Sequence, residues 1–189
     1  MTTRKIIAET ERLILRRYQK GDLQDLYEYL SDAEVVAFEP YEPLTLKEVK
    51  EELKWRVGTE EMIAIELKSS HKMIGNIYMG NREFDTLEMG YLLNRNYWGH
   101  GYATESCQAL IRQAFSDGCH RIYAECDPCN KRSWKLLEAL GFQREAHFRE
   151  NTYFQKDKNG NVIWKDTYVY ARLNPGPLSS DQFSFHDIR

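Results

Sequence analysis

The sequence lacks several features that would place it in a special class of protein. No apolar stretch is long enough to span a membrane, no apolar core of a signal peptide follows the first residues, and no low-complexity segment precedes the C-terminal tail. The net charge of -3 gives no reason to expect a nucleic-acid ligand. We therefore expect a cytoplasmic protein that binds neither membranes nor nucleic acid.

Cysteine is scarce, with four residues in the chain. Cys126 and Cys129 form a C-x-x-C sequence, but the second pair that a zinc ribbon needs is missing. A redox pair would normally open a helix, whereas Pro128 lies between these cysteines at the end of an expected strand. A structural role for reduced thiols is favoured over a redox role, and we expect no metal site.

The composition is that of a globular chain, with 42% hydrophobic and 29% charged residues. A length of 189 residues fits one domain. The sequence Asn174-Pro175-Gly176-Pro177 precedes a polar end and indicates a domain boundary. We predict a single domain over 1–173 and a flexible tail over 174–189, with docking of Phe183 and Phe185 on a neighbouring molecule as the alternative.

The pattern of apolar residues predicts a mixed α+β fold. Seven segments have the character of strands, at about 12–18, 62–67, 73–78, 87–93, 120–126, 143–153 and 162–172. Four segments have helical spacing and capping residues, at about 22–30, 45–57, 103–117 and 133–140. Thr45 with Glu48 forms a capping box, and Asn159-Gly160 indicates a hairpin turn.

The order of these elements predicts how the strands pair. The strands between residues 62 and 93 follow one another closely, as in an antiparallel meander. The helix at 103–117 then links two strands in a strand–helix–strand unit, which makes them parallel. We expect a mostly antiparallel sheet of six to seven strands with one parallel pair, flanked by four helices.

Residues 96–104 carry the strongest chemical signal, because they follow a predicted strand, open a predicted helix and contain Gly99 and Gly101. The first N–H groups of a helix have no partners within it and bind phosphate well, and glycine lets the ligand approach. No Gly-Lys-Ser/Thr follows, as a Walker A loop requires, and Thr104 replaces the third glycine of a dinucleotide fingerprint. A phosphate-binding turn is therefore predicted, with a simple tight loop as the alternative.

A second group of polar residues begins at Asn130, between a predicted strand and a predicted helix. Its amide side chain is a good helix N-cap and is also placed to reach a ligand between neighbouring strands. Asn130 can have both roles, the helix cap through its position in the backbone and the ligand contact through its side chain.

Taken in order, three motifs resemble those of the GNAT acetyltransferase superfamily. They are Glu88-Met89-Gly90-Tyr91, the run from Trp98 to Glu105, and Asn130-x-x-Ser133 with Gly141-Phe142. The likeness is greatest to the branch that holds the ribosomal-protein N-terminal alanine acetyltransferases. The segments Thr10–Arg16 and Asp166–Tyr170 match that branch too, so the resemblance covers about residues 8–173.

This resemblance implies the GNAT fold, in which the two parallel strands splay apart around the pantetheine arm of acetyl-CoA. It also implies that the co-substrate is acetyl-CoA and that the acceptor is a primary amine on a small molecule or at a protein N-terminus. The residues that would bind the cofactor are Tyr91, Leu92, Leu93, Asn96, Trp98, Gly99, His100, Gly101, Tyr102, Ala103, Thr104, Asn130 and Ser133. Asn96 departs from the usual Gln or Arg of the family, but backbone amides carry most of that site.

The resemblance also suggests catalytic residues. Many GNAT enzymes have a tyrosine that protonates the leaving thiolate where this sequence has Leu137, so we expect Ser133 to stabilise the thiolate instead. The backbone N–H of Tyr91 would bind the oxyanion if its strand carries the family's bulge. Glu88 is the candidate base, with an ordinary surface carboxylate as the alternative, and His100 is expected to be a polar loop side chain.

The acceptor is left open by the sequence. Glu39, Tyr41, Glu42, Glu83 and Asp85 would make an acidic, aromatic mouth that attracts a cation, although solvated loop charges are the simpler reading for most of them. A polyamine, an amino sugar or another small amine is the alternative to a protein N-terminus. A non-catalytic acyl-CoA sensor is a further alternative, and a homodimer is compatible with each.

Overall fold

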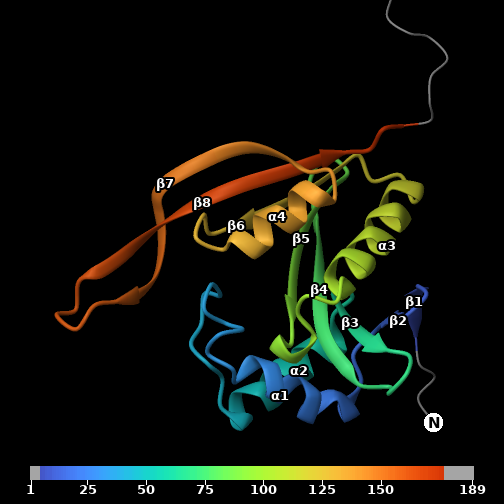
Figure 1. The fold of residues 1–189 in the computed structure, drawn as a ribbon, viewed down its shortest axis with the longest axis horizontal. Helices are drawn as coiled ribbons and strands as arrows, with labels where there is room; N and C mark the ends of the chain where they lie inside the picture. Colours follow the sequence, from blue (N-terminus) through green and yellow to red (C-terminus); the bar gives the residue numbers. More distant parts are fainter. Residues whose placement is uncertain (1–4, 177–189) are drawn as a thin grey trace, which may run out of the picture.

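One mixed sheet organises the structure (Figure 1). The computed structural model describes residues 5–176, and within them the sheet has eight strands in the order β1-β2-β3-β4-β5-β6-β8-β7. The strands are β1 Ile6–Glu9, β2 Leu13–Arg16, β3 Met62–Leu67, β4 Met73–Arg82, β5 Thr86–Leu93, β6 Arg121–Cys126, β7 Gln143–Lys156 and β8 Val162–Leu173. Neighbours are antiparallel except β5 and β6, which are parallel.

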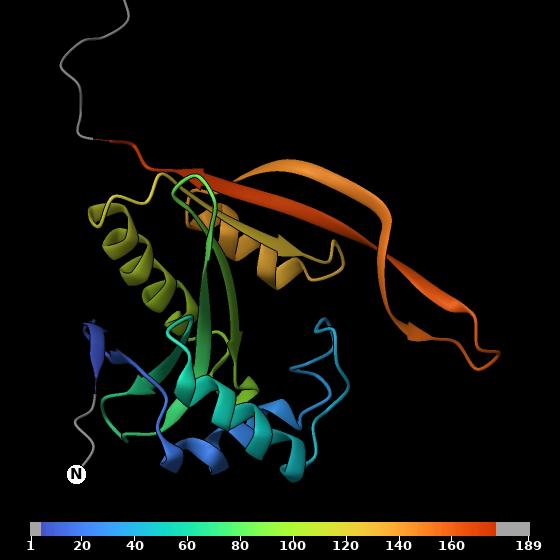
Figure 2. The same ribbon diagram turned by 180° about the vertical axis from the view of Figure 1, so that it is seen from behind.

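Four α-helices cover the two faces of this sheet in the described part of the chain. They are α1 Leu23–Leu30, α2 Leu46–Gly58, α3 Tyr102–Ser116 and α4 Lys131–Ala139, and short 3-10 turns, η1 Lys20–Asp22 and η2 Arg95–Tyr97, precede α1 and α3. One core cluster joins α3 and α4 to the sheet, and a second joins α1 and α2 to its opposite face. Figure 2 shows α1 and α2 from behind, away from α3 and α4.

The predicted mixed fold with one parallel pair is confirmed, but the number of strands is eight rather than six to seven. The additional strand is β1, which pairs with β2 at the edge of the sheet and has no buried residue. A short, exposed edge strand has no apolar alternation to reveal it. The capping box at Thr45 and Glu48 and the N-cap at Asn130 are both present as predicted.

The β7–β8 hairpin extends well beyond the helices (Figures 1 and 2). Its base is tied to the core by Thr167, Tyr170 and Ala171 of β8, which are buried, whereas most of β7 is exposed. The predicted turn lies at residues 157–161, where Gly160 has a φ of 85° that glycine adopts without strain. The hairpin is therefore a ribbon anchored at one end.

Most of the predicted tail, including Phe183 and Phe185, lies outside the described residues. Within residues 5–176, no helix has both the length and the apolar character needed to cross a membrane.

A buried ion cluster joins the first strands to α1. Arg16 is 3% exposed and donates to both oxygens of Asp22, at 2.8 and 2.7 Å, and to Glu66 at 2.6 Å. Asp22 and Glu66 are themselves buried, so the guanidinium is an ion-pair partner of two carboxylates that have left water. Removing the cation alone would take this ion pair away from both carboxylates.

We predict that Arg16→Met lowers the free energy of unfolding by about 3–5 kcal/mol, measured by urea denaturation, because it removes the buried cation that pairs with two buried carboxylates. Lys5→Met is the matched control: it breaks the exposed ion pair of Lys5 with Glu60 and should leave the free energy of unfolding almost unchanged. If both substitutions changed the free energy of unfolding equally, burial of the Arg16 ion cluster would not explain its contribution to stability.

Candidate active site

The two parallel strands separate halfway along their length. β5 and β6 pair only at Thr86–Arg121, Leu87–Ile122 and Glu88–Tyr123, although β5 continues to Leu93 and β6 to Cys126. Figure 1 shows the two strands running apart beyond this point. Each strand therefore presents backbone groups that its parallel neighbour does not bind.

The pairing with β4 determines which groups of β5 face β6. The Asn94 N–H donates to the Ile74 carbonyl oxygen at 2.8 Å, and hydrogen-bonded and non-bonded pairs alternate from there along the antiparallel ladder. The backbone groups of Tyr91 and Leu93 consequently point toward β6. Those of Leu92 point toward β4, opposite Asn76, and are not available to a ligand between β5 and β6.

The family's bulge, on which the oxyanion role of the Tyr91 N–H was made conditional, is absent from the described pairing of β4 with β5. Over the described lengths of both strands, β4 and β5 pair in continuous register from Gly75–Leu93 to Arg82–Thr86. The Tyr91 N–H reaches the open side by ordinary strand alternation and needs no bulge. The Leu93 carbonyl on this side already accepts a hydrogen bond from Trp98 Nε1 at 2.7 Å.

The predicted phosphate-binding turn is the N-terminus of α3. Gly99 and Gly101 have φ values of 78° and 79°, and Gly101 is an N-cap without a side-chain capping bond. The N–H groups of Tyr102, Ala103 and Thr104 have no acceptors within the helix, so they are donors for an anion. A diphosphate fits this arrangement.

Two other residues of the predicted set point elsewhere. The Asn96 side chain donates weakly to Glu28 of α1, at 3.4 Å, and so lies away from the amides of α3. The exposed His100 ring contacts the carbonyl oxygen of Trp98 at 2.9 Å, as expected for a loop side chain. The pKa of Glu28 is lowered, mainly by its hydrogen bond with Lys72.

Arg12, directly before β2, supports this turn, a role that the motifs did not reveal. Its guanidinium donates to Glu105 of α3 at 2.7 Å and to the His100 carbonyl oxygen at 3.0 Å. It also lies 4.4 Å from the centre of the Tyr102 ring. Glu105 in turn accepts a hydrogen bond from Thr10 at 2.5 Å, so the turn is fixed to the edge of the sheet.

The start of α4 faces the same region from the side of β6. The Asn130 side chain accepts a hydrogen bond from the Ser133 N–H at 3.2 Å, which confirms the cap and leaves its amide nitrogen for a ligand. The guanidinium carbon of Arg132 lies 4.3 Å from the centre of the Trp98 ring, a contact that joins α4 to the phosphate turn. Leu137 is completely buried in the core.

Ser133 is brought directly against Tyr91. The two hydroxyl oxygens are 2.9 Å apart, and the Tyr91 hydroxyl also lies 2.9 Å from the carbonyl oxygen of Ser133. Burial raises the pKa of Tyr91 well above its usual value. Two of the three predicted catalytic residues therefore meet at the open end of β5.

Glu88 lies on the other face of the sheet, because its neighbours Leu87 and Met89 pack in the cluster of α3 and α4. Its carboxylate forms an ion pair with Arg82 and accepts a hydrogen bond from the Tyr123 hydroxyl at 3.2 Å. Burial raises the pKa of Tyr123. Glu88 thus stands at the last paired position before β5 and β6 separate, on the face of α1 and α2.

Gly90 leaves this face open next to Glu88. A Cβ added there would find only the Tyr78 Cβ within 4 Å, at 3.7 Å. The missing side chain leaves room for an acceptor on one face of the sheet, whereas Tyr91 and Ser133 lie on the other.

The residues of the predicted acceptor mouth divide into two groups. Glu39 and Tyr41 precede α2, and burial raises the pKa of both. Gln155 of the β7–β8 hairpin donates to Glu42 at 3.0 Å, so the hairpin meets this loop. Glu83 and Asp85 lie instead in the turn between β4 and β5, bordering a depression lined by Asn81, Arg82, Glu83, Phe84, Thr86 and Tyr123.

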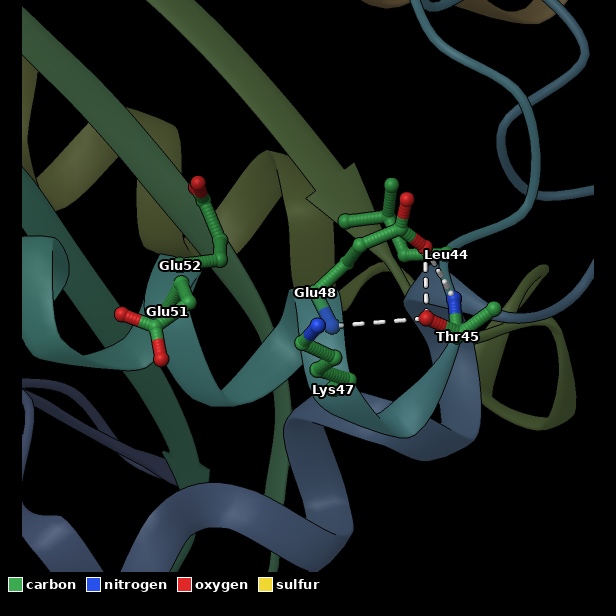
Figure 3. Close-up of a pocket in the computed structure, with 6 residues that line it drawn as sticks. All are labelled: Leu44, Thr45, Lys47, Glu48, Glu51 and Glu52. Atoms are coloured by element: carbon green, nitrogen blue, oxygen red, sulfur yellow. Dashed lines mark hydrogen bonds between the residues drawn. The ribbon is translucent and has the colours of Figure 1, made fainter.

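A second depression lies at the start of α2 and contains none of the predicted site residues (Figure 3). It is lined by Leu44, Thr45, Lys47, Glu48, Glu51 and Glu52. The Glu48 carboxylate accepts hydrogen bonds from Thr45 in the capping box, at 2.8 and 2.6 Å, so it has a structural role.

Comparison with known proteins agrees with this geometry. The model of the acetyltransferase (GNAT) domain matches residues 12–143. The uncharacterised N-acetyltransferase YnaD of Bacillus subtilis is 33% identical over 170 residues, which cover 87% of this chain and 95% of that protein. The crystal structure of a GNAT-family acetyltransferase from Bacillus anthracis is 30% identical, with a TM-score of 0.79 and coverage of 89% of this chain and 98% of that one.

Two further matches have named acceptors. The ribosomal protein uS5-alanine N-acetyltransferase of Escherichia coli is 32% identical over 101 residues, 53% of this chain and 48% of that protein. A spermidine N-acetyltransferase from Vibrio cholerae, solved with CoA and spermine, shares the fold at 19% identity, with a TM-score of 0.73 and coverage of 87% and 97%. The separated parallel strands, the free amides of α3 and these matches lead to one conclusion: the chain belongs to the GNAT family of acetyltransferases.

Proposed function

We propose that this protein transfers the acetyl group of acetyl-CoA to a primary amine by direct attack on the thioester. The observation that supports this most is the separation of β5 from β6 beside the free amides at the start of α3. Acetyl-CoA is a long, flexible thioester that carries a diphosphate. An unpaired strand edge can bind its amide-containing arm, and a helix N-terminus can bind its diphosphate.

The residues for binding acetyl-CoA lie along a continuous path. The N–H groups of residues 102–104 would hold the diphosphate, with Gly99 and Gly101 giving it access. The backbone of Tyr91 and the free amide nitrogen of Asn130 would bind the pantetheine arm. None of these glycines and amide groups would contact the acceptor, so the proposed binding of acetyl-CoA is the same whichever amine is acetylated.

The chemistry requires a neutral amine, an oxyanion donor and a stabilised leaving group. The acceptor ammonium, with a pKa of about 8 at a protein N-terminus and about 10 in an alkylamine, must lose a proton first. Glu88 is the proposed proton acceptor on the open face beside Gly90. The Tyr91 N–H, which points toward β6, is the proposed oxyanion donor. Ser133 on the opposite face is the proposed donor to the thiolate.

We propose a protein N-terminal amine as the acceptor. The support is the relative from Escherichia coli that acetylates the alanine of uS5, and the extended hairpin and loop around Glu42, which offer a broad surface beside the site. A small polyamine is the second candidate, supported by the fold shared with the spermidine enzyme.

Acetylation of an amine panel, read by mass spectrometry, tests the proposal. The panel should contain peptides with free N-terminal alanine or serine, the same peptides with blocked N-termini, spermidine and an amino sugar. We expect acetyl-CoA-dependent gain of one acetyl group on the free peptides alone. Transfer to spermidine alone would reverse the choice of acceptor, and tight CoA binding without any transfer would identify a sensor.

We predict that Gly101→Val raises the Kd for CoA about 10- to 100-fold in calorimetry, because a β-branched residue disfavours the φ of 79° and displaces the amides of α3. Gly160→Val is the matched control. It has a φ of 85° in the hairpin turn, so it should cost stability but leave the Kd unchanged. An unchanged Kd for Gly101→Val would refute the phosphate-binding assignment.

We predict that Glu88→Gln lowers kcat/KM for the amine about 100-fold while the KM for acetyl-CoA stays unchanged, because only proton removal is lost. Glu145→Gln, which breaks a similar partly exposed pair with Arg121, should leave both constants unaltered. Should Glu88→Gln retain full activity at every pH tested, Glu88 is a structural partner of Arg82 and not the base.

A further inference from the structure

The side chain of Tyr91 bridges the open end of the sheet. Tyr91 lies on β5 and Ser133 in the first turn of α4, and their hydroxyl oxygens are 2.9 Å apart. Residue 137, where many GNAT enzymes carry a tyrosine, is one helical turn beyond Ser133, and Leu137 there is completely buried. A phenol from β5 thus reaches the same side of α4 on which the family's usual phenol is missing.

We propose that Tyr91 is a positioning residue that directs the Ser133 hydroxyl toward the sulfur of CoA. This inference rests on the proposed function, since it concerns the leaving group of the same reaction. It assigns a role to the Tyr91 side chain in addition to the role of its backbone N–H.

The hydrogen-bonding capacity of the two hydroxyls supplies the reason. Serine has one proton and two acceptor positions, and so has tyrosine. If Tyr91 donates to the Ser133 carbonyl oxygen, the Ser133 proton is drawn toward the Tyr91 oxygen and away from a ligand. If Tyr91 donates to Ser133 Oγ, the serine proton is free to point at the sulfur, and the serine is a stronger donor because its oxygen is polarised. Both Ser133 oxygens lie 2.9 Å from the Tyr91 hydroxyl, so its proton can turn to either one. A bound sulfur favours the second arrangement, because it accepts the Ser133 proton that would otherwise go to Tyr91.

The surroundings keep Tyr91 a proton donor. It lies among apolar residues of the core cluster of α3 and α4, and burial raises its pKa. The nearest thiols, Cys107 of α3 and Cys126 of β6, have pKa values raised by burial to about 12 and about 11. Tyr91, Cys107 and Cys126 therefore all stay neutral at physiological pH.

The step balances without an additional reactant. As the acyl adduct collapses, the carbon–sulfur bond breaks and its electron pair goes to sulfur. The Ser133 hydroxyl donates a hydrogen bond to the developing negative charge, held in place by Tyr91. The sulfur finally takes up the proton that the amine nitrogen has released, so Ser133 and Tyr91 keep their own protons.

Tyr91→Phe tests the inference in a steady-state assay with the full-length protein. We expect kcat to fall about tenfold, with the KM for acetyl-CoA and the Tm nearly unchanged, because an oriented donor is lost and packing is retained. Tyr170→Phe is the matched control. It removes another buried hydroxyl that binds α4, through Glu138 at 3.0 Å, and should leave kcat unchanged.

A double-mutant cycle distinguishes positioning from an independent role. If Tyr91 acts through Ser133, Tyr91→Phe should have no further effect on kcat in the Ser133→Ala background. If the fall in kcat of the double variant equalled the product of the two single falls, the two residues would act independently and the inference would be overturned. A full wild-type kcat in Tyr91→Phe would overturn it as well.

Titration of bound CoA provides a test that needs no acceptor. The absorbance of the thiolate at alkaline pH, after subtraction of the same titration of the CoA-free protein with its own thiols, reports the pKa of the bound thiol. We expect this pKa to rise by about one pH unit in both Tyr91→Phe and Ser133→Ala relative to wild type. Identical titrations would refute the inference, whereas absence of acetyl transfer by the wild type would refute the proposed function alone.

Discussion

The separation of β5 from β6 is the constraint on which the rest of the site depends. β5 is bound to β4 along its whole length and β6 to β8, so each strand keeps a complete antiparallel partner while the parallel pairing ends at Glu88–Tyr123. Backbone groups that lose one partner need another. Trp98 satisfies the Leu93 carbonyl. The Tyr91 N–H is left facing the opening, where a ligand can bind it, and the Tyr91 side chain crosses to Ser133 of α4. The opening and the residues around it therefore make up the proposed site.

The two helices that begin beside this opening are held by distant parts of the chain. Arg12, directly before β2, fixes the start of α3 through Glu105 and the His100 carbonyl. Arg132 of α4 contacts Trp98 at the start of the same turn. A helix end binds phosphate well only if its amides are already oriented, because ordering them on binding would cost conformational entropy. These tethers provide that preorganisation.

The sheet also separates the two halves of the proposed reaction. Tyr91 and Ser133 lie with α3 and α4, where the leaving sulfur would be, and Glu88 with the open space at Gly90 faces α1 and α2, where the amine would enter. Strand alternation alone achieves this, because consecutive residues of β5 point to opposite faces. In the proposed reaction, the short motif Glu88-Met89-Gly90-Tyr91 would thereby serve both substrates.

The sequence by itself determined the mixed fold, the parallel pair, the glycine turn and the caps at Thr45 and Asn130, because these features depend on local periodicity and on residues a few positions apart. Tertiary structure alone decided the rest. The edge strand β1 forms only because β2 offers a partner, and the Tyr91 N–H faces β6 because of pairing with β4. The Tyr91 hydroxyl and the Arg12 guanidinium find their contacts across 42 and 93 residues, and Arg132 meets Trp98 through the packing of separate elements. Contacts between residues so far apart leave no periodic trace in the sequence, since each depends on where the whole sheet places its strands.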